Sequence, residues 1–164
     1  MLDNPSELPL HIDFCFRKSA LQRVALSPAP KFSYAIHSSC STRNLLEQWL
    51  ENYLKGIHLP PPLTLALSHL SPFSQHILKA IQAVPFGETA TYQGIAKTSG
   101  HAQACRAAGN ICHNNPYPML IPCHRIIRSN GQIGGFALGS QLKTKLLAFE
   151  HKVKKLCARQ KTSC

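Results

Sequence analysis

The sequence predicts an α+β protein in which a small β-rich N-terminal domain precedes a mainly helical domain. Three observations predict this class. Apolar residues alternate with polar ones in two stretches before residue 40, a period of two that is typical of half-buried strands. After a proline-rich segment at 60–63 they recur at helical spacing, as on the buried face of an amphipathic helix. Two short helical segments are then separated by a Ser-Gly break, which is the sequence shape of a helix-turn-helix.

Local signals place each element. Ser71 is a candidate N-cap, Pro72 suits the first position of a helix, and Ser140 opens the last helix. The expected elements, in chain order, are strands at 12–16 and 32–36 and helices at 45–54, 72–84, 91–98, 102–113 and from residue 140 onward. The expected units are an N-terminal domain over 1–62 that ends in a proline-rich linker, a second domain over 70–157 and a basic tail over 158–164.

The positive charge lies almost wholly in the second half of the chain. Residues 1–88 hold seven Lys or Arg against six Asp or Glu, whereas residues 89–164 hold eleven against one. A strongly basic half indicates a polyanionic partner, most often nucleic acid. A solvated basic C-terminal segment explains the charge equally well, because residues 143–161 alone carry seven of the eleven bases.

The composition also argues against several classes of protein. No apolar run approaches the ~20 residues of a membrane-spanning helix, and the first residues lack the basic and apolar regions of a secretory signal. The seven cysteines form no CxxC pair, which favours reduced thiols and an intracellular protein. The nine histidines include no HxxxH-like set, so we expect no catalytic metal and no cofactor. Cys15, His37 and Cys40 are the few candidate ligands for a structural zinc ion in the N-terminal domain.

The second helix of the pair, at 102–113, carries mostly small side chains. Alanine and glycine occupy much of it, and Arg106 is its only firm charge. Such a helix can enter a DNA groove with Arg106 directed outward. The same small residues allow close packing in a protein core, and the sequence alone leaves both explanations open.

The stretch IPCHRII, residues 121–127, places a thiol, an imidazole and a guanidinium side by side between apolar residues. Burial of His and Arg is costly unless both have partners, while a nearby cation lowers the pKa of a thiol and favours the reactive thiolate. On a strand Cys123 and His124 would face opposite sides, so we expect a turn, or a water between them. Glu150 is the only carboxylate in the basic half and the candidate partner of His124. A surface pair with Lys154 is the alternative for Glu150.

Six segments of the second half resemble, in order, the successive motifs of the O6-alkylguanine-DNA alkyltransferases. They are PFGETATYQGIA, RAAGN, NNP, IPCHRII, NGQIGGF and KTKLLAFE, and the resemblance covers about Pro72 to Glu150. When it occurs together with the other five segments, PCHR is highly specific to this family. The resemblance implies a winged-helix-like DNA-binding unit, and the N-terminal part is similar to the family only in its layout.

The resemblance also implies catalytic roles. Cys123 would accept the alkyl group from O6 of guanine in a single displacement. His124, through a water, and Glu150 would form the relay that makes Cys123 a thiolate. Tyr92 would donate a hydrogen bond or proton to the departing base, and Asn115 would brace the site.

Contacts with the substrate follow from the same resemblance. Arg106 would intrude into the duplex where the damaged nucleotide is flipped out. The implied DNA-contacting residues are Arg106, Ala107, Tyr92, Gln93, Arg125 and Arg128. The implied pocket residues are Pro122, Ile126, Phe136, Ala137 and Leu138. Two of these depart from the common pattern: Phe136 stands where many members have tyrosine, and Leu138 stands where glycine is frequent, which would narrow the pocket.

The implied function is DNA repair by an enzyme that acts once: a methylated-DNA–protein-cysteine methyltransferase acting on double-stranded DNA that contains alkylated guanine. We expect a monomer without an obligate protein partner, cytoplasmic or, in a eukaryotic host, nuclear. The alternatives are a non-catalytic protein that senses alkylated bases and a thiol redox sensor, for which Cys112 is the nearest resolving cysteine in sequence. A helix-turn-helix transcriptional regulator is a third and weaker alternative, because few groups on 102–113 can read bases.

Overall fold

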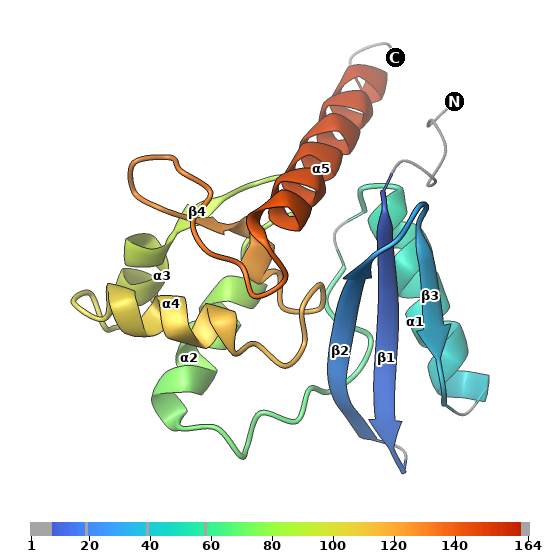
Figure 1. The fold of residues 1–164 in the computed structure, drawn as a ribbon, viewed down its shortest axis with the longest axis horizontal. Coiled ribbons are helices and arrows are strands. Elements are labelled where there is room, and N and C mark those ends of the chain that lie inside the picture. The colour runs from blue at the N-terminus through green and yellow to red at the C-terminus, as the bar shows by residue number, and fades with distance from the viewer. Residues whose placement is uncertain (1–7, 19, 39, 58, 162–164) are drawn as a thin grey trace.

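The computed structural model describes residues 8–18, 20–38, 40–57 and 59–161. Its strands and helices form two groups, with the three N-terminal strands and the first helix on one side and the other helices on the other (Figure 1). In chain order they are β1 (Leu10–Arg17), β2 (Ala20–Pro28), β3 (Ser33–Ile36), α1 (Cys40–Leu54), α2 (Pro72–Gln82), β4 (Ala90–Thr91), α3 (Tyr92–Thr98), α4 (Cys105–His113), a 3-10 turn (Cys123–Arg125), β5 (Ile126–Ile127) and α5 (Ser140–Lys161). This is the α+β class that the sequence predicts.

In the N-terminal sheet, β1 is the central strand, antiparallel to β2 and parallel to β3. Leu10, Ile12 and Phe14 of β1 are fully buried, because alternate residues of a strand point to the same face. α1 adds Leu46 and Leu50 to this core. The alternating pattern predicted β1 and β3, whereas β2 is a strand that the pattern did not predict.

The helical part begins where the capping signals place it. Ser71 caps α2 by accepting a hydrogen bond from the backbone N–H of Ser74 at 3.2 Å, and Thr91 caps α3 in the same way through Gly94 at 2.9 Å. α4 begins at Cys105, three residues later than predicted, because residues 101–104 form a turn. α2, α3 and α4 all pack against one another, and α3 and α4 are the two short helices that the sequence predicts as a helix-turn-helix.

Hydrogen bonds join the two groups. The backbone N–H of Val24 in β2 donates to the carbonyl of Pro116 at 2.9 Å. The Tyr117 hydroxyl donates to the carbonyls of Leu21 at 3.3 Å and Ala66 at 3.2 Å. The sheet is therefore fixed against the segment that leads from α4 to the Cys123 turn.

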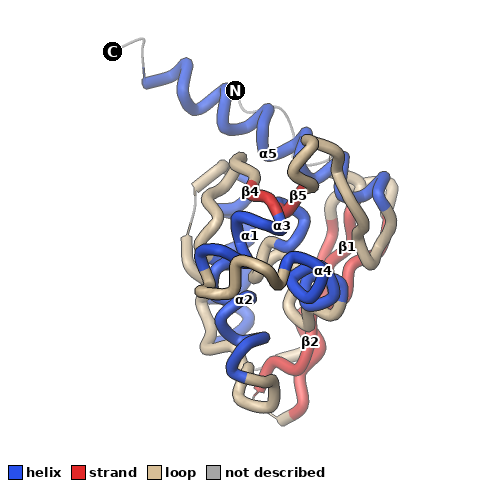
Figure 2. The backbone as a smooth tube through the Cα atoms, turned by 90° about the vertical axis from the view of Figure 1, so that its left-hand side faces the viewer, coloured by secondary structure: helices blue, strands red, loops and turns tan. Residues whose placement is uncertain are grey.

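Two further contacts position the Cys123 turn. β4 and β5 pair in parallel, which brings the start of α3 beside the residues that follow the turn. α5 packs on the turn itself, and its C-terminal half extends beyond the body of the molecule (Figure 2). α5 continues to Lys161, into the segment expected to form a basic tail. No helix in the described part of the chain has both the length and the hydropathy to cross a membrane.

Candidate active site

Cys123 is the first residue of the 3-10 turn and follows Pro122. It is only 4% exposed. The Asn115 side-chain amide donates to the Cys123 sulfur at 3.2 Å and to the carbonyl of Ile121 at 2.8 Å. The Asn115 side-chain oxygen in turn accepts the backbone N–H of Tyr117 at 3.0 Å. Burial raises the pKa of the Cys123 thiol, while the Asn115 amide and the ammonium of Lys143 act in the opposite direction.

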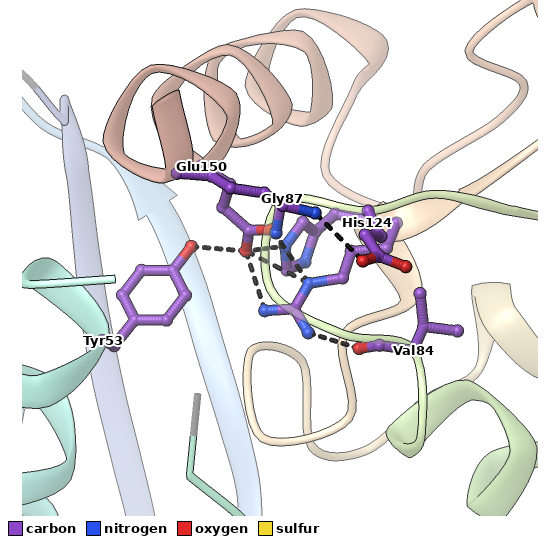
Figure 3. A network of polar contacts seen from close by, with 8 residues as sticks. Tyr53, Val84, Gly87, His124 and Glu150 are labelled. Atoms are coloured by element: carbon purple, nitrogen blue, oxygen red, sulfur yellow. Dashed lines mark hydrogen bonds and ion pairs between the residues drawn. The ribbon is translucent and has the colours of Figure 1, made fainter. Parts of the chain in front are cut away.

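A fully buried carboxylate, Glu150 of α5, lies at the centre of the polar contacts beside this turn (Figure 3). One carboxylate oxygen, Oε1, accepts from His124 Nε2 at 2.8 Å, from the Tyr53 hydroxyl at 2.9 Å and from the Arg125 guanidinium at 3.0 Å. The other, Oε2, accepts from Arg125 Nε at 2.9 Å and from the backbone N–H of Gly87 at 3.0 Å. Burial opposes ionisation of Glu150, but His124 and Arg125 outweigh it and lower the pKa of Glu150 to about 2.

The contact with Glu150 fixes the tautomer of His124. A carboxylate oxygen only accepts hydrogen bonds, so the shared proton lies on Nε2, and in the neutral ring Nδ1 is then an acceptor. Nδ1 is buried and has no hydrogen-bond partner among the described residues. The imidazole therefore presents a free basic nitrogen in the same turn as the thiol.

Gly87 is required by the geometry of this network. Its φ of +68° lies in the left-handed region, which side chains other than glycine rarely adopt. A Cβ at this position would lie 2.8 Å from a side-chain carbon of Lys154 and 3.1 Å from the backbone oxygen of Glu150. Only a glycine lets the backbone come close enough for its N–H to reach the carboxylate.

The prediction that Arg125 contacts DNA is wrong. Its side chain is 3% exposed, and its guanidinium binds both oxygens of Glu150, donates to the carbonyl of Val84 at 2.7 Å, and lies over the ring of Phe86 at 5.6 Å. A guanidinium that is already paired inside the protein cannot reach a phosphate. The family resemblance implied a DNA contact at this position, whereas in the structure the guanidinium balances the charge of Glu150.

The sequence analysis missed Lys143, a fully buried lysine of α5. Its ammonium donates to the carbonyl of Ile126, the residue after the 3-10 turn, and to that of Gly135 at 3.4 Å. It also lies 5.7 Å from the centre of the Tyr92 ring. Burial lowers the pKa of Lys143, and the nearby thiols oppose this. The signal was present, since position 143 falls three and seven residues before Leu146 and Glu150 on the buried face of the helix.

Tyr92 is half-buried at the start of α3, with its hydroxyl donating to the carbonyl of Gly135 at 3.2 Å. Burial and the neighbouring thiols Cys112 and Cys123 raise the pKa of Tyr92 to about 12. The phenol therefore keeps its proton at neutral pH. Gly134, at a φ of +71°, leaves room for it, because a Cβ there would lie 3.2 Å from the Tyr92 oxygen.

The remaining predicted residues fall into two sets. Arg106, Gln93 and Arg128 are exposed, and Ala107 is partly exposed beside Arg106 on α4. Pro122 and Ile126 are buried and Phe136 is partly buried, whereas Ala137 is exposed. Leu138 is 37% exposed and lines a hollow that also includes Pro9 and Pro28. The roles of both sets stay predictions.

The described residues contain no group of three or more His, Cys, Asp or Glu side chains that could hold a metal ion. Of the three residues considered for a zinc, the side chain of Cys40 lies outside the part that the structure describes.

The ionised state of Glu150 predicts a loss of stability in acid. Its pKa of about 2 in the folded protein lies below the ordinary value of 4.5, so the carboxylate stabilises the fold above pH 4.5. This contribution, on the order of 3 kcal/mol, is lost as the pH falls toward 2. We expect the free energy of unfolding, measured by urea denaturation, to decline across this window. Glu150→Gln has no titrating group at this position and should decline less; an equal decline in both proteins would contradict the assignment.

Comparisons with known proteins agree with this arrangement. Residues 72–152 match the family model described as the DNA-binding domain of 6-O-methylguanine DNA methyltransferase. The methylated-DNA–protein-cysteine methyltransferase of Mus musculus is 40% identical over 109 residues, which cover 62% of this chain and 52% of the mouse protein. That of Methanosarcina acetivorans is 41% identical over 78 residues, covering 48% of this chain and 50% of the archaeal protein. The chain thus spans about half the length of these curated relatives.

The fold has solved counterparts. The structure of Mycobacterium tuberculosis OGT in complex with DNA has a TM-score of 0.68 and 24% identity, and covers 87% of this chain and 94% of that one. The fold and the site therefore define an α+β protein with a buried cysteine next to a His–Glu pair, in a turn that packs against α2 and α5. Residues 72–152, which hold Cys123, His124 and Glu150, belong to the 6-O-methylguanine DNA methyltransferase family.

Proposed function

We propose that this protein transfers an alkyl group, chiefly methyl, from O6 of guanine in double-stranded DNA to the sulfur of Cys123. One observation carries the proposal: Cys123, His124 and Glu150 are all buried in one site. Within it, His124 Nε2 lies 2.8 Å from Glu150 Oε1. A cysteine that serves only as core packing needs no such neighbours.

The transfer is a single displacement. The thiolate of Cys123 attacks the alkyl carbon, the S–C bond forms as the C–O6 bond breaks, and the electron pair of the broken bond stays on the guanine. His124 takes the thiol proton at Nδ1, through a bridging water, while its Nε2–H remains bonded to Glu150. Burial alone disfavours the thiolate, so a proton acceptor and the donors Asn115 and Lys143 are needed to form it.

Tyr92 is the group that meets the departing base. A guanine that leaves with an extra electron pair departs more readily when a proton donor faces it. The raised pKa of Tyr92, about 12, keeps its phenol protonated for this role. Lys143 lies over the Tyr92 ring and also bonds the backbone after Cys123, so one buried ammonium positions both the donor and the nucleophile.

The exposed side of α3 and α4 is the proposed DNA surface. Arg106 and Gln93 are exposed there, and Arg128 is exposed in the loop that follows the reactive turn. Cys123 is 4% exposed, so guanine O6 reaches it only if the nucleotide is flipped out of the stack, which costs a few kcal/mol. Arg106 would fill the space that the base leaves. The structure of M. tuberculosis OGT was solved in complex with DNA, which supports the same partner here. We propose that one copy of this chain binds it.

Each molecule should act once, because the thioether product has no easy route back to a thiolate. The test is the intact mass of the full chain after incubation with a duplex oligonucleotide that contains one O6-methylguanine. We expect the mass to rise by one methylene, with saturation at one per chain and the modification confined to Cys123 by peptide mapping. Binding of the oligonucleotide without any gain in mass would make the protein a sensor of alkylated bases instead.

The redox-sensor alternative gains no support from Cys112. Burial, with a smaller contribution from Cys123, raises the pKa of Cys112 to about 12. A thiol that keeps its proton at neutral pH is a poor resolving group, because the thiolate is the attacking form.

A further inference from the structure

Tyr53 contacts the proposed relay from outside the matched family segment. It lies on α1, and its hydroxyl donates to Glu150 Oε1 at 2.9 Å across 97 residues of sequence (Figure 3). The side chain is 3% exposed, so no bulk water competes for this bond. The acceptor is the same oxygen that accepts from His124.

Three aromatic rings hold the Tyr53 ring in place. Trp49 stacks on it at 5.8 Å between ring centres, Phe149 stacks at 6.0 Å, and Phe86 meets it edge-on at 5.3 Å. Offset-stacked and edge-to-face contacts at these distances are favourable. The hydroxyl is therefore aimed at Glu150 by packing and cannot turn away without displacing the core.

The Tyr53 hydroxyl changes what His124 experiences. Oε1 carries part of the negative charge of the carboxylate, and each donor that shares the oxygen reduces the charge left for the others. Burial and the adjacent Glu150 raise the pKa of Tyr53 well above 10, so it always acts as a neutral donor. If the Tyr53 hydroxyl were removed, Oε1 would interact more strongly with the imidazole of His124.

We propose that Tyr53 is a positioning residue for alkyl transfer, which holds Glu150 Oε1 against His124 and limits how firmly the imidazole retains a proton. This inference rests on the function proposed above and adds to it a residue of the N-terminal part. A base must be neutral to accept the thiol proton. An imidazole that keeps its own proton up to a higher pH would leave Cys123 as an unreactive thiol over a wider acidic range.

The four groups that donate to Glu150 come from three segments. They are Tyr53 of α1, the N–H of Gly87 before β4, and His124 and Arg125 of the 3-10 turn. Two further charged residues, Lys154 of α5 and Glu88, are about half exposed and pair with each other at 3.0 Å. Among the described side-chain donors to the carboxylate, Tyr53 is the one that neither is a cation nor becomes one during the proposed transfer, so its hydroxyl can be removed without changing any formal charge.

The test compares Tyr53→Phe with the wild-type full chain. The probe is a duplex oligonucleotide with one O6-methylguanine, and the single-turnover rate of methyl transfer to Cys123 is followed from mildly acidic to mildly alkaline pH. We expect Tyr53→Phe to be about fivefold slower on the acidic side, the worth of one buried hydrogen bond, and close to wild type on the alkaline side. The acid limb of the profile moves to higher pH.

Tyr117→Phe is the matched control. Tyr117 is also a buried tyrosine, 1% exposed, and its hydroxyl also joins the N-terminal part to the rest of the chain, but through carbonyls of Leu21 and Ala66. It should lower the thermal midpoint as Tyr53→Phe does and leave the acid limb in place. A second variant carries a ring-fluorinated tyrosine at position 53 only. This residue keeps the shape of the tyrosine side chain and makes its hydroxyl a stronger hydrogen-bond donor, so the acid limb of the profile should move to lower pH.

The outcomes separate this inference from the function beneath it. Loss of rate by the same factor at every pH, or an acid limb that stays in place in both position-53 variants, would reduce Tyr53 to a packing residue and overturn the inference. Absence of methyl transfer by the wild type at any pH would overturn the proposed function itself. Transfer by the wild type with an unmoved limb in the variants would overturn only the role of Tyr53.

Discussion

Replacement of Cys123 by alanine is expected to abolish methyl transfer completely while the protein still folds and binds DNA. No other described cysteine sits in a turn with a His–Glu pair, and the change removes one small, buried side chain. Removing a buried sulfur in this way costs on the order of 1 to 2 kcal/mol of stability, which leaves most of the population folded. The measurement is intact mass after incubation with the methylated duplex, paired with a binding assay on the same oligonucleotide.

Cys112→Ala is the control for this prediction. Cys112 is buried to a similar degree, at 7% exposure, but its thiol has a pKa of about 12. It should retain transfer with one methyl per chain. Transfer that survives in Cys123→Ala, or that disappears only in Cys112→Ala, would show that the nucleophile has been assigned to the wrong cysteine.

Replacement of Arg125 by methionine is expected to be the most destabilising single change in the site. The methionine fills much of the same space but leaves the Glu150 carboxylate buried with no fixed positive charge. Removal of one partner from a buried ion pair costs about 3–5 kcal/mol. Chemical denaturation near neutral pH measures this loss directly.

Arg128→Met provides the comparison for Arg125. Arg128 is three residues further along, exposed, and bonded to the side chain of Gln132 at 3.3 Å, so its loss should change the free energy of unfolding by less than about 0.5 kcal/mol. Similar values for the two variants would mean that Arg125 does not compensate Glu150.

Much of the helical part is predictable from local signals. Ser71 and Thr91 cap α2 and α3, and Ser140 is the first residue of α5. Capping acts within one turn of helix and is therefore visible in sequence. The contact between His124 and Glu150 could also be predicted, because the basic half contains a single carboxylate and a buried imidazole needs a partner. Both inferences use short-range rules or elimination, and the structure confirms the contact.

The errors arise where the cause lies far away in sequence. The alternating pattern did not predict β2, because the pairing of β2 with β1 shifts register between Cys15 and Phe16. As a result, the buried residues of β2 do not alternate strictly with exposed ones; they are Leu21, Val24 and Leu26. Tyr53 looked like one more apolar position of α1, since the partner of its hydroxyl lies on α5. Arg125 was assigned to DNA by the family resemblance, and its partner Glu150 also lies on α5. Whether a polar group points inward depends on a partner that only the tertiary fold supplies.

The stacked pair on α1 has a practical consequence. Trp49 is the single tryptophan of the sequence, it is 7% exposed, and its ring lies on Tyr53, whose hydroxyl touches Glu150. One side chain, Tyr53, thus separates the indole from Glu150, the group that orients His124. Its emission changes with the polarity around it, so the molecule carries an intrinsic optical reporter of whether α1 is seated on the reactive centre. Assembly of that centre during refolding can be followed by fluorescence, without any attached dye.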